Sequence, residues 1–279
     1  MHTLRIATWN AEGMFVSNSM TKRASPHDAI RTIKMLDADL IVIPEFGVHG
    51  TLEQPIRTTL HSLGYEIVEL PYEDKTMPNH VPKNYEMAVL SRLPITSRVT
   101  NRLGGTRNSV ELTATFDGHE LRIFGIHLDD KTEASRMAQV KDLARLINGN
   151  VETPTLLIGD FNAMAKASQF ARLMRSAFAR QVTKSISHEQ LKSITKRLHD
   201  MALGTTLEYL FDQTHLIDFD PGRQHTLSGK QAGLEWMPSI RLAKIDWILG
   251  SRHFSVESYK IIKDVGSDHR PVLATVRMK

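Results

Sequence analysis

The sequence predicts an α/β fold with mixed β-sheets, and three observations lead to this class. Short apolar runs recur along the chain, as buried strands do. Helical patterns separate some of these runs but not all of them, so helical crossovers cannot join every pair of neighbouring strands. The stretch FDGHEL, residues 116–121, contains the Asp-Gly pair of a hairpin turn, which indicates antiparallel pairing.

Two helices and eight strands are expected outside the basic segment described below. The first helix begins at Pro26, because Ser25 is a suitable N-cap and apolar residues recur on one face as far as Leu36. The second helix runs from about Thr132 to Ile147. The expected strands are Leu4–Trp9, Leu40–Ile43, Met87–Leu90, Val110–Phe116, Leu121–Ile126, Thr155–Ile158, Ile245–Leu249 and Pro271–Arg277.

The segment 165–204 is the basic part of the chain and is expected to form a pair of helices. It has eight Lys and Arg residues and two acidic ones, a net charge of +6, while the whole chain carries +4 and the remainder therefore −2. Ser187 and Gln190 have capping-box spacing before the second helix, and Gly204 is a natural stop. The alternative to a binding role is an amphipathic hairpin whose charged face meets only water.

Length and composition suit one globular domain. The chain has 279 residues, 41% of them hydrophobic, and a sequence pI of about 9.2, which weakly favours anionic partners. The absence of cysteine excludes disulfides and thiolate metal sites. No apolar run is long enough to cross a bilayer, and the first residues lack the regions of a signal peptide. We expect a cytoplasmic protein, with no protein partner inferred and a monomeric state.

Polar or ionisable side chains stand at the ends of six expected strands. A single carboxylate at a strand end is usually a turn or capping residue, but polar or ionisable side chains at six strand ends indicate a shared site. If all six meet at one rim, four strands point toward that rim and two point away, which only a mixed sheet allows. The residues are Asn10 with Glu12, Glu45, His127, Asp160 with Asn162, Asp246, and Asp268 with His269.

These residue types favour metal-assisted hydrolysis of a phosphoester. Carboxylate and amide oxygens select Mg²⁺ or Mn²⁺ over zinc. Asparagine and cationic histidine suit a phosphate whose charge grows in the transition state, and a further carboxylate can activate water. The chemistry follows from the set of residues and not from any one of them.

The motifs TWNAEG, IPEF, EMAVLSRLPI, GIHL, GDFN, KIDWIL and SDHRPV, in this order, resemble the endonuclease/exonuclease/phosphatase superfamily. They extend from residue 8 to residue 272. The resemblance implies the deoxyribonuclease I-like fold, a four-layered α-β-β-α sandwich with two mixed β-sheets. It also implies one domain over residues 1–279, in which the basic helical segment at about 165–204 is an insertion.

The resemblance assigns a metal site to four residues. Glu45 matches the principal metal-ligand glutamate, and Asn10 matches an asparagine that lies beside the metal. Glu12 stands where some members have a second carboxylate of the metal site. Asp268 matches an aspartate near the metal. The implied cofactor is Mg²⁺ or Mn²⁺.

The resemblance also assigns the catalytic groups. Asp160 matches the aspartate that activates or orients the attacking water, and Asn162 matches the asparagine that contacts the phosphate. His269 matches the histidine that binds or protonates a phosphate oxygen, and Asp246 matches its carboxylate partner. His127 stands where deoxyribonuclease I and many phosphatases of the superfamily have a histidine that meets the substrate. Glu86 matches a glutamate that pairs with this histidine and raises its pKa, the alternative being an exposed strand charge.

A nucleic acid is the leading substrate, because the His127–Glu86 pattern and the basic segment both favour it. The alternative is a phosphatase or phosphodiesterase acting on a small or lipid phosphoester, such as an inositol phosphate or sphingomyelin, with the basic helices facing an anionic membrane. A third hypothesis is a catalytically silent binding protein that keeps only the fold. Arg107 is expected in a loop as a solvated charge.

Overall fold

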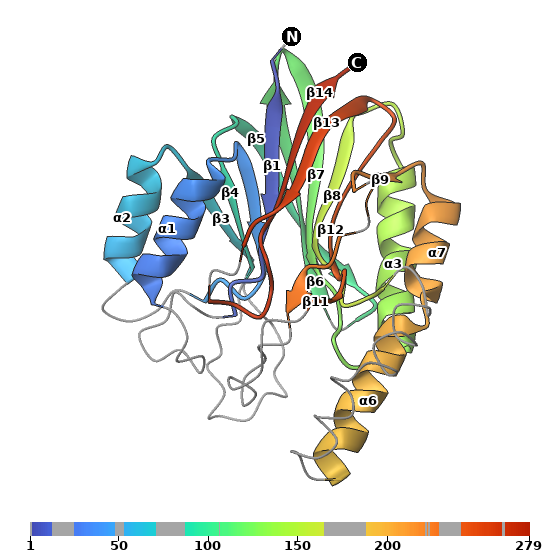
Figure 1. Cartoon of the computed structure of the whole chain (residues 1–279). Coiled ribbons are helices and arrows are strands. Elements are labelled where there is room, and N and C mark those ends of the chain that lie inside the picture. The colour runs from blue at the N-terminus through green and yellow to red at the C-terminus, as the bar shows by residue number, and fades with distance from the viewer. Residues whose placement is uncertain are drawn as a thin grey trace.

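A computed structural model describes residues 2–12, 25–47, 53–70, 87–105, 107–164, 188–220, 222, 224–228, 241–263 and 266–279. Two six-stranded sheets pack face to face, with helices on the outer face of each (Figure 1). Within the described residues, no helix has both the length and the apolar character needed to cross a membrane.

The first sheet contains both ends of the described chain. Its only parallel pair in the described residues is β1 with β2, and its other neighbours are antiparallel. The strand order is β13 (Phe254–Ile261), β14 (Val272–Met278), β1 (Leu4–Thr8), β2 (Leu40–Ile43), β4 (Met87–Ser91) and β3 (Glu66–Leu70).

The second sheet is also mixed. Strands β7 and β8 are parallel, while β8 and β12 are antiparallel. The strand order is β5 (Ile95–Leu103), β6 (Arg107–Phe116), β7 (His119–His127), β8 (Thr155–Asp160), β12 (Asp246–Gly250) and β9 (Ile217–Asp218). A separate two-stranded sheet pairs β10 (Leu227–Ser228) with β11 (Arg241–Ala243).

Three apolar clusters make the sandwich. Between the sheets, side chains such as Ile6 and Val89 of the first meet Ile123 and Ile248 of the second in one buried cluster. A second cluster joins the first sheet to α1 (Pro26–Leu36) and α2 (Glu53–Ser62), and a third joins the second sheet to α3 (Glu133–Asn148) and α7 (Thr205–Gln213). The predicted α-β-β-α layering is therefore confirmed (Figure 1).

Local sequence explains where the predicted helices begin. Helix α1 starts at Pro26 with a capping box in which Ser25 and Asp28 exchange side-chain and backbone hydrogen bonds. Helix α3 begins after Thr132, whose hydroxyl accepts a hydrogen bond from the backbone N–H of Ser135. The FDGHEL hairpin is confirmed, since β6 and β7 pair antiparallel around it.

The eight predicted strands are confirmed, with ends that shift by up to three residues; the last, for example, begins at Val272 and not at Pro271. The elements that were not predicted are α2, α7, β3, β5, β13 and the short strands β9, β10 and β11. Of the predicted helical pair, the second is α6 (His188–Ala202), while the first lies outside the described residues. Helix α6 ends before Gly204 as expected, and that glycine, with a φ of 77°, also begins α7.

Candidate active site

The predicted site residues meet at one rim of the sandwich, and the strand register explains why. In the parallel pair β7 and β8, His127 lies opposite Asp160, and in the antiparallel pair β8 and β12, Asp160 lies opposite Asp246. Strands β1 and β2 bring Asn10 and Glu45 to the same rim from the other sheet. The expectation that four strands point toward the rim and two away is confirmed.

Asn10 links the carboxylates of the two sheets. Its side-chain Nδ2 donates hydrogen bonds to Glu45 Oε1 and to Asp160 Oδ2, each at 3.1 Å. Its Oδ1 accepts a hydrogen bond from the backbone N–H of Glu12 at 3.0 Å, and Glu12 Oε2 accepts one from the backbone N–H of Asp268 at 3.0 Å. All four predicted metal-site residues are therefore joined in one hydrogen-bonded corner.

His269 and Asp246 form a buried pair that bridges the two sheets. His269 Nδ1 lies 3.0 and 2.9 Å from the two carboxylate oxygens of Asp246. Burial alone would lower the pKa of His269, but the carboxylates of Asp246, Asp268 and Asp160 outweigh it and raise this pKa well above its usual value. The imidazole is therefore held in its charged form.

Asp160 stands between two histidines. Its Oδ2 lies 3.8 Å from His269 Nε2 and 3.8 Å from His127 Nε2. Burial raises the pKa of Asp160, the charge of His269 opposes this, and Asp246 adds to the rise. Asn162 is fixed beside it, since its backbone N–H donates to Asp160 Oδ1 at 2.8 Å and its side-chain Nδ2 donates to the carbonyl of Leu128 at 3.0 Å.

His127 is neutral, whereas His269 is cationic. Burial, followed by the guanidinium of Arg107, lowers the pKa of His127 to about 3, so that this imidazole is neutral at pH 7. The predicted partner Glu86, which would act in the other direction, lies outside the described residues. A Glu86–His127 pair therefore stays a prediction.

Backbone strain is concentrated at this rim. Five non-glycine residues in the described part of the chain have positive φ, and three of them are predicted site residues: Glu12 (50°), Glu45 (55°) and Asn162 (47°). Such conformations cost energy and persist where the surrounding structure enforces them, often at functional sites. Gly159 has a φ of 145°, and a Cβ there would lie 1.9 Å from the carbonyl oxygen of Ile126, so glycine is required next to Asp160.

The residues of this rim fit a divalent cation. Burial, assisted by Asp160 and Glu12, raises the pKa of Glu45 to about 7, as expected for a carboxylate that needs a counter-charge. Asp160, Asp246 and His269 also place one donor atom each within 4.8 Å of one another, but the carboxylates that raise the pKa of His269 keep this imidazole protonated, and a protonated imidazole has no lone pair for a metal. The oxygen donors around Glu45 are thus the better match for a hard cation.

Sequence reasoning missed three residues of this region. Ser267 Oγ donates to the carbonyl of Asn10 at 2.8 Å and accepts from the backbone N–H of His269, and its place as the first residue of the SDHRPV motif was a usable signal. Arg107 was expected in a loop as a solvated charge, which is wrong: it is the first residue of β6, its side chain is 11% exposed, and it lies 3.3 Å from Asp130. Thr226, described below, gave no signal.

A two-sheet sandwich with carboxylates and histidines at one rim defines a class of protein, the deoxyribonuclease I-like phosphoesterases. A family model described as the Endonuclease/Exonuclease/phosphatase family matches residues 7–269. The chain belongs to this family, whose members act on phosphoester bonds. No curated protein sequence matches it.

Solved structures agree with this fold. The chain is similar to an endonuclease/exonuclease/phosphatase family protein from Bacteroides thetaiotaomicron (15% identity, TM-score 0.66, covering 99% of this chain and 97% of the other). It is also similar to a mannosyl-6-phosphatase from Bacteroides thetaiotaomicron (15% identity, TM-score 0.66, covering 99% of this chain and 100% of the other). A third similar structure is the human Nocturnin catalytic domain (16% identity, TM-score 0.62, covering 99% of this chain and 95% of the other). At these identities the likeness shows the fold alone.

Proposed function

We propose that the protein hydrolyses phosphodiester bonds of nucleic acid with the help of Mg²⁺ or Mn²⁺. The observation that carries the proposal is the position of Asp160 Oδ2, 3.8 Å from Nε2 of both histidines and hydrogen-bonded to the asparagine that also holds Glu45. A base, a cationic group and a cation-binding corner thus lie within a few ångströms of one another.

Glu45, with Glu12, Asn10 and Asp268, would hold the cation. When bound, the cation supplies charge neutralisation for a phosphate oxygen. Glu45 would be its principal ligand, since burial and neighbouring carboxylates already disfavour its charge in the absence of a cation.

The protein's own groups divide the remaining work. Asp160 accepts a proton from the attacking water, and its raised pKa makes it a better base than an exposed carboxylate. Cationic His269 stabilises charge on a phosphate oxygen, and Asp246 keeps that imidazole oriented and protonated. Asn162 and neutral His127 contact the phosphate by hydrogen bonds and add no charge.

Two features support nucleic acid as the substrate. Helix α6, with Lys192 and Lys196 exposed, extends beyond the sheets at the end where β1 terminates (Figure 1). It is attached to the site, because the backbone N–H of Met164, two residues after Asn162, donates to the carbonyl of Met201 at 2.8 Å. Lysines placed in this way gain affinity for a polyanion by releasing its counterions.

The test is a substrate panel in Mg²⁺ with the wild type, His269→Ala and His119→Ala. His119 is an exposed histidine at the opposite end of β7 from His127 and serves as the matched control. The panel contains plasmid DNA, single-stranded DNA, RNA, inositol phosphates, a sugar phosphate and sphingomyelin. Cleavage of DNA or RNA that is lost in His269→Ala and kept in His119→Ala is the expected result. Activity confined to the small or lipid phosphoesters would overturn the nucleic-acid substrate, and no activity on any of them would overturn the proposal as a whole.

A further inference from the structure

The pair Asp246–His269 poses a geometric problem, because its two members come from different sheets. Asp246 begins β12 of the second sheet, and His269 precedes β14 of the first. A hydrogen bond of 2.9 Å between them requires the beginnings of β12 and β14 to be held in a fixed relation at the rim. We propose that Thr226 is a positioning residue that sets this relation. The proposal rests on the proposed function of the pair.

Thr226 fixes the beginning of β12. It is fully buried, and its Oγ1 accepts hydrogen bonds from the backbone N–H groups of both Ile245 and Asp246, each at 3.1 Å. Strand β9 pairs with β12 only at Leu249 and Gly250, near the other end of the strand. At the beginning of β12, the hydroxyl of Thr226 therefore supplies the hydrogen-bond acceptor that a neighbouring strand would otherwise supply.

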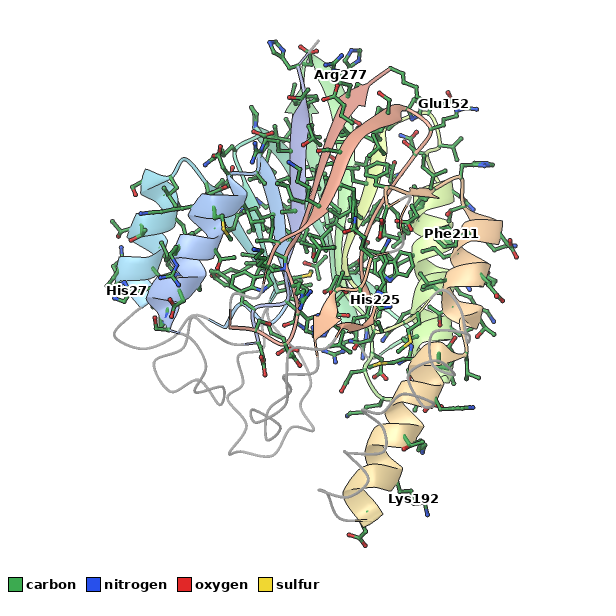
Figure 2. All side chains as sticks on the ribbon, in the orientation of Figure 1. His27, Glu152, Lys192, Phe211, His225 and Arg277 are labelled. Carbon is green, nitrogen blue, oxygen red and sulfur yellow. The ribbon has the colours of Figure 1, made fainter. Side chains whose placement is uncertain are left out.

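The same short segment also holds the other member of the pair. The carbonyl of Thr226 accepts a hydrogen bond from the backbone N–H of Arg270 at 2.8 Å, and Leu227 forms an isolated antiparallel bridge with His269. Residues 226 and 227, which we call the clasp, thus contact both Asp246 and the backbone around His269. In Figure 2 the neighbouring His225 lies at the lower end of the strands, by β11.

The clasp is itself anchored on the chain leading into β12. The backbone N–H of Thr226 donates to the carbonyl of Ala243 at 2.8 Å. Lys244, the residue after Ala243, is buried, and its Nζ lies 2.8 Å from Asp218 and 3.1 Å from Asp220, which joins the chain before β12 to these two aspartates. Because buried polar groups that are all paired hold a single arrangement, the clasp has little freedom to let the pair drift apart.

The variant Thr226→Val tests the proposal, because it keeps the side-chain volume and removes the acceptor of two buried N–H groups. We expect kcat to fall at least tenfold while KM stays within twofold, and we expect Thr226→Ser, which keeps the hydroxyl, to remain within threefold of the wild type. In the Asp246→Asn background, Thr226→Val should cost less than twofold, since residues that act through one another are not additive. The matched control is Thr155→Val, a buried threonine at the start of β8, at the opposite end of the sheet.

A second readout does not depend on activity. The Nδ1–H proton of His269, identified by its loss in His269→Ala, should give a downfield proton NMR signal in the wild type and in Thr226→Ser. It should be weakened or shifted in Thr226→Val and unchanged in Thr155→Val. If the wild type proves inactive on every substrate, the proposed function fails and this signal still decides the role of Thr226. If Thr226→Val does not fold, Thr226→Ala carries the same expectations.

Three results would overturn the proposal. The first is a wild-type kcat together with an unchanged His269 signal in Thr226→Val or Thr226→Ala. The second is an equal loss of kcat in the Asp246→Asn background, which would mean that Thr226 does not act through Asp246. The third is an equal loss in Thr155→Val, which would indicate general destabilisation.

Discussion

At the residue scale, two histidines less than 4 Å from the same carboxylate oxygen differ in charge: His269 is cationic and His127 is neutral. His269 faces three aspartates, and their negative charge outweighs the effect of burial on its pKa. His127 is buried near the guanidinium of Arg107, and both influences disfavour its protonated form. One imidazole is therefore suited to charge stabilisation and the other to a neutral hydrogen bond, a difference that residue type alone does not encode.

Glu45 gives the residue-scale prediction. Burial raises the pKa of Glu45 from its ordinary value of 4.5 to about 7 in the folded protein, so the folded state binds a proton more tightly than the unfolded state does. The stability that this proton gives is complete below about pH 4.5 and is lost as the pH rises through 7. In the absence of metal, Glu45→Gln should therefore be more stable than the wild type at pH 8, by about 3 kcal/mol.

Chemical denaturation at pH 5 and pH 8, in EDTA and in Mn²⁺, measures this effect. The two proteins should converge at pH 5, and Mn²⁺ should stabilise the wild type far more than the variant, because a divalent cation supplies the counter-charge that the variant no longer needs. Mn²⁺ affinity of the wild type should also weaken as the pH falls below 7. A Glu45→Gln protein that binds Mn²⁺ as tightly as the wild type would remove Glu45 from the metal site.

At the scale of single elements, β8 depends on Gly159. A Cβ at this position would meet the carbonyl oxygen of Ile126 in β7, in addition to the strain of its positive φ. Gly159→Ala should therefore destabilise the protein by about 3 kcal/mol or more and displace Asp160, which follows it. Gly118 is the control, since it has a φ of 81° in the β6–β7 hairpin with open space around it, and Gly118→Ala should cost only about 1 kcal/mol.

Thermal or urea unfolding of both variants, together with turnover of the folded fraction, checks this expectation. Strain alone predicts similar losses in the two variants, whereas the clash predicts a large difference between them. Equal stabilities would show that β7 moves to accommodate the methyl group, and that the close approach of β7 to β8 does not depend on glycine.

Burial decides which elements could be predicted from the sequence. Strands such as β2 and β8 are buried throughout and contain continuous apolar runs because both faces are covered, and such runs are easy to recognise. Strand β5 was missed because it is an edge strand with most of its side chains exposed, so no buried face imposes a pattern on ITSRVTNRL. Strand β13 is likewise an edge strand with several exposed residues, and it was missed for the same reason.

The residues of the site likewise divide into those that the sequence could predict and those that it could not. Residues such as Glu45 and Asp160 could be predicted because they stand at or just beyond the ends of buried strands, and the direction of the strands then places them at one rim. Thr226 and Arg107 could not, because their importance comes from segments distant in sequence: Thr226 meets β12 twenty residues later, and Arg107 meets the residues that follow β7. The charge state of His127 was also beyond the sequence, since it depends on burial.

At the scale of the whole molecule, basic residues lie at both ends of the sandwich. Lys192 lies on α6 at the lower end in Figure 2, and Arg277 lies at the upper end, where the chain also finishes. The net charge of the whole chain is only +4, so nonspecific attraction of a polyanion to the entire surface is weak, and a local basic element matters more. If α6 binds substrate, affinity should depend on its lysines and not on basic residues at the far end.

The paired substitution Lys192→Ala with Lys196→Ala tests this distribution of charge. Affinity of the Ca²⁺-bound protein for a short DNA duplex should fall, and the slope of log affinity against log salt should decrease in magnitude by about 2, since each lost phosphate contact removes about 0.9. The control pair is Arg252→Ala with Arg277→Ala, for which the slope should not change. Arg252 follows the end of β12 opposite to Asp246, and Arg277 lies at the upper end in Figure 2. Fluorescence anisotropy between 50 and 200 mM salt measures both. An unchanged slope in the lysine variant would mean that the charged face of α6 meets only water, and the nucleic acid would then have to be bound by the rim alone.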